Sequence, residues 1–187
     1  MRTKTITHRV WHHSLTKKNL GGSDAESFAD YHVNTLGWPG GGYTFIIEPK
    51  NLINTPNGKR ARIVYANDID RRTYHVGNSN QFSLGICVAG DYRYDTMDEA
   101  TLASNAELHA ALVKDGIGQF DKAHNEMPGY GLKKVCCQIT TEMHFIGKVQ
   151  RLQSNHIRLL RFIQSKKVIL YGALHIRMGR VEYKLKI

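Results

Sequence analysis

The chain has 187 residues, of which 41% are hydrophobic, and its formal net charge is +10. This length fits one main domain with a small appendage, and the composition excludes a disordered or fibrous protein. Apolar runs stay well below the roughly 18 residues of a membrane span, so we expect no transmembrane segment. The basic start has no apolar stretch behind it, and the sequence therefore predicts a protein that is cytoplasmic at synthesis, with no signal peptide.

The positive charge is concentrated towards the C-terminus. Residues 145–187 contain ten lysines and arginines and a single acidic residue, Glu182, so residues 1–144 are nearly neutral. Such a segment is attracted to polyanions, although it is most often a solvated charged surface. It has no base-reading motif and few aromatic residues between the basic ones, which makes nucleic-acid binding the less favoured interpretation.

The first half of the chain alternates strand and helix signals. Residues 6–11 predict a short strand that ends at His12-His13. Residues 23–26 have the spacing of a capping box, and apolar residues follow at helical intervals as far as Leu36. We therefore expect an amphipathic helix that stops before Gly37 and Pro39.

Further strands and a second helix follow. The β-branched and aromatic run at 43–47 predicts a buried strand, and Asn57-Gly58 offers a hairpin turn before a strand at 62–65. Residues 82–89 are apolar enough for a central strand. A second capping box at 96–99 predicts a helix with Leu102, Ala106, His109, Leu112 and Val113 on its buried face. The predicted fold class is α/β, with a central mixed β-sheet flanked by helices.

Two segments contain candidate metal ligands. Side chains alternate along a strand, so only one of His12 and His13 can point at a common centre. Residues 123–137 form a loop-like stretch that includes His124 and the adjacent thiols Cys136 and Cys137. Two imidazoles and one thiolate around Zn²⁺ would leave the fourth position open, as in a catalytic rather than a structural site.

Each of these residues also has an ordinary structural interpretation. A pair of histidines at a strand end is more often a partly buried polar pair, and a lone cysteine is more often a small buried hydrophobe. Glu126 is equally compatible with a general base and with a backbone brace. A structural interpretation is also given to six further histidines, His8, His32, His109, His144, His156 and His175.

Four sequence strings, taken together, resemble a known family. WHHS, GWPGGGYTFII, YHVGNSNQFSLGICVAGDY and AHNEMPGY followed by KVC occur in the order and spacing of the type 2 N-acetylmuramoyl-L-alanine amidases. That family includes amidase-type phage lysozymes and is related to animal peptidoglycan-recognition proteins. The resemblance covers roughly residues 5–140. It implies a zinc amidase catalytic domain at 1–140 and a basic C-terminal extension of unknown role at 141–187.

The resemblance also implies roles for particular residues. Its metal ligands fall on His12, His124 and Cys136, and its catalytic residues on Tyr43 and Lys134, while His75 would border the substrate groove. Zn²⁺ is then the expected cofactor. Two positions depart from the family, because Thr44 stands where a histidine is frequent and Cys137 where proline is usual. Either Cys136 or Cys137 could therefore be the thiolate ligand.

The implied substrate is peptidoglycan, cut between N-acetylmuramic acid and L-alanine. The leading hypothesis is a phage or prophage endolysin that reaches the cell wall after release and whose basic extension binds anionic wall polymers. The alternative is a non-catalytic recognition module of the same fold that binds muropeptides. A third hypothesis, nucleic-acid binding through residues 145–187, rests on charge alone.

Overall fold

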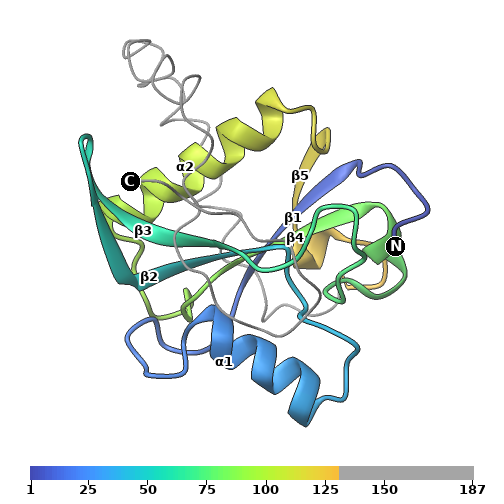
Figure 1. The fold of residues 1–187 in the computed structure, drawn as a ribbon, viewed down its shortest axis with the longest axis horizontal. Coiled ribbons are helices and arrows are strands. Elements are labelled where there is room, and N and C mark those ends of the chain that lie inside the picture. The colour runs from blue at the N-terminus through green and yellow to red at the C-terminus, as the bar shows by residue number, and fades with distance from the viewer. Residues whose placement is uncertain (131–187) are drawn as a thin grey trace, which may run out of the picture.

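The computed structural model describes residues 1–130, and residues 131–187 lie outside the described part. A five-stranded mixed sheet has the order β3-β2-β4-β1-β5 (Figure 1). The strands are β1 (His8–His13), β2 (Phe45–Thr55), β3 (Gly58–Tyr65), β4 (Ser83–Val88) and β5 (Phe120–Ala123). The helices are α1 (Ala25–Asp30) and α2 (Glu99–Lys114). The predicted α/β fold with a mixed, helix-flanked sheet is confirmed.

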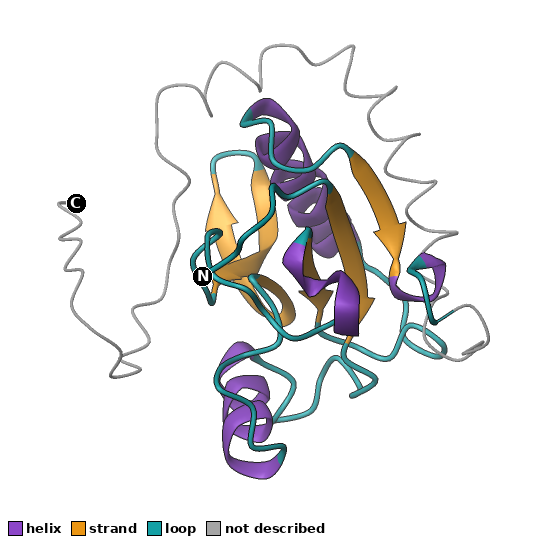
Figure 2. Cartoon of the chain, turned by 90° about the vertical axis from the view of Figure 1, so that its right-hand side faces the viewer, coloured by secondary structure: helices purple, strands orange, loops and turns teal. Residues whose placement is uncertain are grey.

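The strand pairing brings distant parts of the chain together. β1 lies between β4 and β5 and runs parallel to both, and β2 runs parallel to β4. Only β3 is antiparallel to its neighbour, because it is joined to β2 by the predicted hairpin, in which Thr55 pairs with Gly58. Figure 2 shows this hairpin at one edge of the sheet and β5 at the other.

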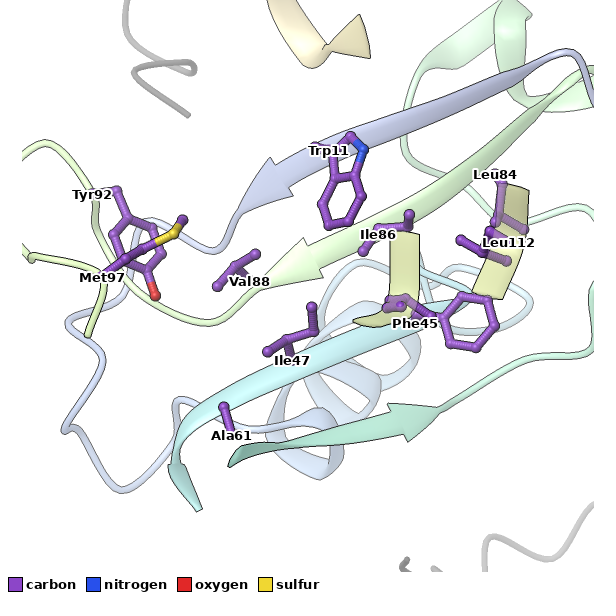
Figure 3. Packing of buried hydrophobic residues seen from close by; sticks show 11 residues of the cluster. Trp11, Phe45, Ile47, Ala61, Leu84, Ile86, Val88, Tyr92, Met97 and Leu112 are labelled. Carbon is purple, nitrogen blue, oxygen red and sulfur yellow. The ribbon is translucent and has the colours of Figure 1, made fainter. Parts of the chain in front are cut away.

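The two helices cover opposite faces of the sheet (Figure 1). On one face, Leu108 and Leu112 of α2 pack with Trp11, Ile47 and Ile86 in the main hydrophobic core (Figure 3). On the other face, Ala25 and Phe28 of α1 pack against Ile46, Cys87 and Ala89. Neighbouring residues of one strand therefore belong to different faces, as the pleat requires.

The first helix differs from its prediction. Its N-cap is Asp24, whose side chain accepts a hydrogen bond from the Ser27 N–H at 2.9 Å, and Ser23 does not serve as the cap. After Asp30 the helix widens into a π-helical turn, Tyr31–Thr35. The wider turn breaks the 3.6-residue periodicity, so Val33 and Leu36, which were expected on the buried face, are each 42% exposed.

The second helix is present and buries Ala106 and Leu112 as predicted, but its buried face extends to residues that were not expected there. Asp98, not Thr96, is its N-cap and accepts a hydrogen bond from the Thr101 N–H at 2.9 Å. Thr101, Ser104 and Asn105 are buried, whereas Val113 is 50% exposed. Thr101 and Ser104 fit this interface because their hydroxyls donate hydrogen bonds, to the Asp98 carboxylate at 2.8 Å and to the Ala61 carbonyl at 2.9 Å.

No helix within residues 1–130 combines the length and hydropathy needed to cross a bilayer.

One carboxylate connects β5, β1 and α2. Asp121 accepts hydrogen bonds from Arg9 at 2.8 and 2.6 Å, from Trp11 Nε1 at 3.0 Å and from His109 Nε2 at 2.9 Å. Partial burial raises the pKa of Asp121, but the hydrogen bonds from Arg9, His109 and Trp11 outweigh it and hold that pKa well below its usual value. The charged form of Asp121 therefore stabilises the fold.

We predict that Asp121→Asn lowers the free energy of unfolding by about 3 kcal/mol at pH 7, because Arg9 loses its buried counter-charge. The depressed pKa means that this stabilisation is complete above the unfolded-state pKa of about 3.9 and is lost as pH falls below it. The difference in free energy of unfolding between the two proteins, measured by urea denaturation, should therefore be full at pH 5 and smaller at pH 3, with the remainder lost at still lower pH. Asp115→Asn, at an exposed carboxylate, should change little at either pH.

Candidate active site

Four of the six predicted site residues meet on the α1 face of the sheet. The His12 ring lies 5.2 Å from the Tyr43 ring, 5.1 Å from the His75 ring and 4.8 Å from the His124 ring, measured between centroids. These residues come from β1, the segment just before β2, the segment before β4 and the residue that follows β5. The other two, Lys134 and Cys136, lie outside the described residues, as does the alternative ligand Cys137.

His12 and His13 face opposite sides of the sheet, as strand alternation predicts. His12 is 2% exposed and stands in the row that also contains Cys87 and Ile46 of the neighbouring strands. His13 points to the other face, where its Nδ1 accepts a hydrogen bond from the Tyr92 N–H at 3.2 Å. Only His12 can therefore take part in the cluster.

The two central imidazoles, those of His12 and His75, are joined by a hydrogen bond. His12 Nε2 and His75 Nδ1 are 3.0 Å apart, so one nitrogen donates and the other accepts. Burial, followed by the neighbouring His75 and His124 rings, lowers the pKa of His12 well below its usual value. Burial likewise lowers the pKa of His75 to about 3. Both rings are therefore neutral near pH 7, and the ring that donates in this contact keeps the lone pair of its other nitrogen available to a ligand.

Local backbone contacts place His75. The Asn80 carboxamide oxygen accepts hydrogen bonds from the backbone N–H of His75 at 3.0 Å and of Val76 at 2.8 Å. The imidazole then lies across β4 at Gly85, where an added Cβ would come within 2.8 Å of the ring. Gly85 is thus the residue that leaves space for His75 beside His12.

Tyr43 is fixed by contacts on three sides. The Asn67 carboxamide donates to the Tyr43 carbonyl at 2.8 Å, and the phenol forms a side-chain hydrogen bond with Cys87. The His32 ring lies 5.6 Å from the Tyr43 ring and stacks on Trp38 at 4.7 Å. His32, interpreted from sequence as structural, therefore belongs to the wall around Tyr43. No sequence signal indicated this role, because His32 is an isolated histidine on the predicted helix.

His124 opens a short helical turn, His124–Glu126, directly after β5. The Glu126 carboxylate accepts a hydrogen bond from the Ala123 N–H at 2.6 Å, so it braces the backbone at this turn. The Tyr130 ring lies 4.3 Å from the His124 ring. Sequence reasoning did not identify Tyr130, because a tyrosine in a Pro-Gly loop is common and carries no spacing signal.

Within the described part of the chain, no group of three or more His, Cys, Asp or Glu side chains is arranged to hold a metal ion. The predicted ligand set has two members there, His12 and His124, and these two rings are adjacent. Its third member, Cys136, belongs to the segment that follows. The arrangement thus provides two neighbouring nitrogen donors, a phenol and a third imidazole in one place.

Comparisons with known proteins agree with this fold. Residues 2–137 match the family described as N-acetylmuramoyl-L-alanine amidase. Among curated proteins, peptidoglycan-recognition protein SC1a of Drosophila melanogaster is 26% identical over 91 residues, which is 49% of this chain and 44% of that protein. The chain therefore spans less than half the length of this curated relative.

Two solved structures have the same fold. The Ph2119 endolysin from Thermus scotoductus MAT2119 bacteriophage Ph2119 superposes with a TM-score of 0.58 and 23% identity, over 69% of this chain and 77% of that one. The N-acetylmuramoyl-L-alanine amidase LysC from Clostridium intestinale URNW gives 0.53 and 20%, over 67% and 74%.

We predict that Gly85→Ala displaces the His75 ring and breaks its contact with His12, because the new methyl group cannot share the space. Overpacking of this kind costs roughly 1–3 kcal/mol of folding free energy. Nitrogen NMR of the imidazoles should show changed tautomer signals for both His12 and His75. Gly21→Ala is the matched control, since a Cβ there meets nothing within 4 Å. An unchanged His12 signal in Gly85→Ala would contradict the prediction.

Proposed function

We propose that this chain, which belongs to the N-acetylmuramoyl-L-alanine amidase family, hydrolyses the amide bond between N-acetylmuramic acid and L-alanine in peptidoglycan. The observation that carries the proposal is the meeting of His12, His124 and Tyr43 on one face of the sheet. Four chain segments that are far apart in sequence contribute to this cluster. A structural role alone does not require three imidazoles and a phenol to converge.

We further propose that Zn²⁺ is the cofactor, held by His12, His124 and Cys136, with Cys137 as the alternative thiolate. The described residues fit this ion, because the two imidazole rings are adjacent and burial keeps His12 in the neutral form that a metal requires. Zinc in such a site would supply a Lewis acid and lower the pKa of a bound water to about 7.

The chain's own side chains would carry the remaining steps. The Tyr43 phenol, beside His12, would orient the attacking water and take part in moving its proton. Lys134 would stabilise the negative charge that develops on the scissile carbonyl oxygen, an effect of about 3–4 kcal/mol for a well-placed donor. His75 would hold the His12 ring through their 3.0 Å contact and border the substrate.

In this proposal residues 1–140 form the catalytic domain, and the protein is an endolysin. It would be synthesised in the cytoplasm and act on the wall after release. The basic extension at 141–187 would then hold it to anionic wall polymers, since opposite charges attract at long range at low ionic strength.

A second candidate function is binding of muropeptides without cleavage. The curated relative is a peptidoglycan-recognition protein, which favours this second function. The two functions differ in a measurable way, because a recognition module releases no stem peptide from peptidoglycan and does not depend on zinc.

The test is mass spectrometry of purified peptidoglycan treated with the full chain. We expect free stem peptides and intact glycan strands, and we expect a chelator to abolish their release. Glycan fragments, or cleavage within the stem peptide, would contradict the amidase proposal. Muropeptide binding without any products, by a chain that contains no zinc, would support the recognition module instead.

We predict that His12→Ala loses most of its zinc, measured by metal analysis of the purified chain, and at least about a thousandfold in kcat/KM. Tyr43→Phe should retain the zinc but lose roughly 100-fold in kcat, because only the proton-handling hydroxyl is removed. His8→Gln, at the far end of β1, is the matched control and should retain both properties. Full zinc and full activity in His12→Ala would exclude the proposed ligand set.

A further inference from the structure

The His124 imidazole has a second aromatic neighbour besides His12. The centroid of the Tyr130 ring lies 4.3 Å from that of His124, and the two ring planes are inclined by 48°. This separation is just below the usual range of about 4.5–7 Å between aromatic rings, so the two rings touch. The His124 ring is thus in contact with His12 of β1 and with Tyr130 of the loop that follows β5.

The hydroxyl end of Tyr130 reaches the segment that contains His75. A Cβ atom at Gly77, two residues after His75, would come within 2.9 Å of the Tyr130 hydroxyl oxygen. Gly77 also has a φ of +53°, a conformation that disfavours any residue with a side chain. The phenol therefore occupies the space that a side chain at position 77 would fill, and Tyr130 bridges His124 and the 75–77 segment.

A small buried apolar cluster holds Tyr130 in place. The side chain packs on Val10, Val76 and Met127, which are at most 3% exposed, and its backbone N–H donates to the Met127 carbonyl at 3.1 Å. These three residues come from the same segments as the three imidazoles, namely β1, the segment before β4 and the loop after β5. Val10 shares the face of His12, because side chains alternate along a strand. Tyr130 therefore lies where the three segments meet.

We propose that Tyr130 is a positioning residue, whose ring holds the His124 imidazole in the orientation in which it faces His12. The inference rests on the proposed function, because the two imidazoles have to converge for both to bind one Zn²⁺ ion. His124 needs such support, since the pairing of β5 with β1 ends at Ala123. Restricting the His124 side chain before the metal binds lowers the entropic cost of binding. Tyr130 acts through His124, and the inference assigns it no contact with substrate or metal.

The experiment measures the zinc affinity of the full chain and its variants by competition with a chromophoric chelator. Tyr130→Ala removes the ring, and we expect it to bind Zn²⁺ about tenfold more weakly, as when other groups that support a metal ligand are removed. Tyr130→Phe keeps a ring against His124 and should retain most of the wild-type affinity. Added zinc should restore peptidoglycan hydrolysis by Tyr130→Ala, because the proposed ligands and catalytic residues are all still present.

Two further variants separate positioning from a general loss of stability. Phe82 packs on the same apolar cluster as Tyr130, but its ring lies against His8, with 5.5 Å between the centroids. Phe82→Ala should therefore lower the free energy of unfolding and retain the zinc affinity. Tyr94→Ala, at a tyrosine that is 79% exposed, should change neither quantity. Wild-type zinc affinity in Tyr130→Ala, or an equal loss of affinity in Phe82→Ala, would overturn the inference.

NMR of the metal-free chain separates this inference from the proposed function. We expect nuclear Overhauser contacts between the ring protons of His12 and His124 in the wild type and in Tyr130→Phe, and weaker contacts in Tyr130→Ala, where the His124 ring is free to turn. A wild type that bound no zinc would contradict the proposed cofactor. Weakened contacts in Tyr130→Ala would still support the positioning role in that case, and unchanged contacts would overturn it.

Discussion

The register between β1 and β5 is the constraint on which the candidate site depends. Trp11 pairs with Ala123, so the next residues on the two parallel strands, His12 and His124, become neighbours. Adjacent strands lie about 4.8 Å apart, which matches the spacing of these two rings. A slip by one residue would place His13, on the wrong face, beside His124. Asp121 opposes such a slip, because its carboxylate joins Arg9 and Trp11 of β1 to α2.

The two faces of the sheet differ in the size of their buried side chains and in their role. The α2 face contains the large apolar residues and supplies most of the buried hydrophobic area. The α1 face has small residues near its centre, Gly85 and Cys87, which leave room for imidazoles and a phenol. Fully buried Glu48 attaches α1 to this face, because it accepts from the Ala25 N–H at 2.8 Å and pairs with Arg62. The candidate site therefore lies on the α1 face, whereas the hydrophobic packing that stabilises the sheet lies mainly on the α2 face.

Sequence patterns predicted the parts of this site that follow from local chemistry. Strand alternation was sufficient to show that His12 and His13 diverge, whereas the family resemblance, not local chemistry, placed Tyr43, His75 and His124 with His12. Patterns could not reveal the four-residue strand β5, which is too short to show a period, or the π-helical turn that exposes Val33 and Leu36. Nor could they identify Gly85 or Tyr130, whose contributions exist only after distant segments pack. The roles of all six site residues stay predictions, and Lys134 and Cys136 also lie outside the described residues.

Charge along the wall of the site suggests how a substrate would be oriented. At one end His12, His75 and His124 form a cluster whose burial disfavours cations, as the lowered pKa values of His12 and His75 show. At the other end Arg72 presents a permanent positive charge. Tyr43 contacts the His12 ring on one side and, through its carbonyl, Asn67 on the other. Under the proposed function the scissile amide would lie at the imidazoles, and an anionic part of the substrate would be attracted towards the positive end of this wall at Arg72.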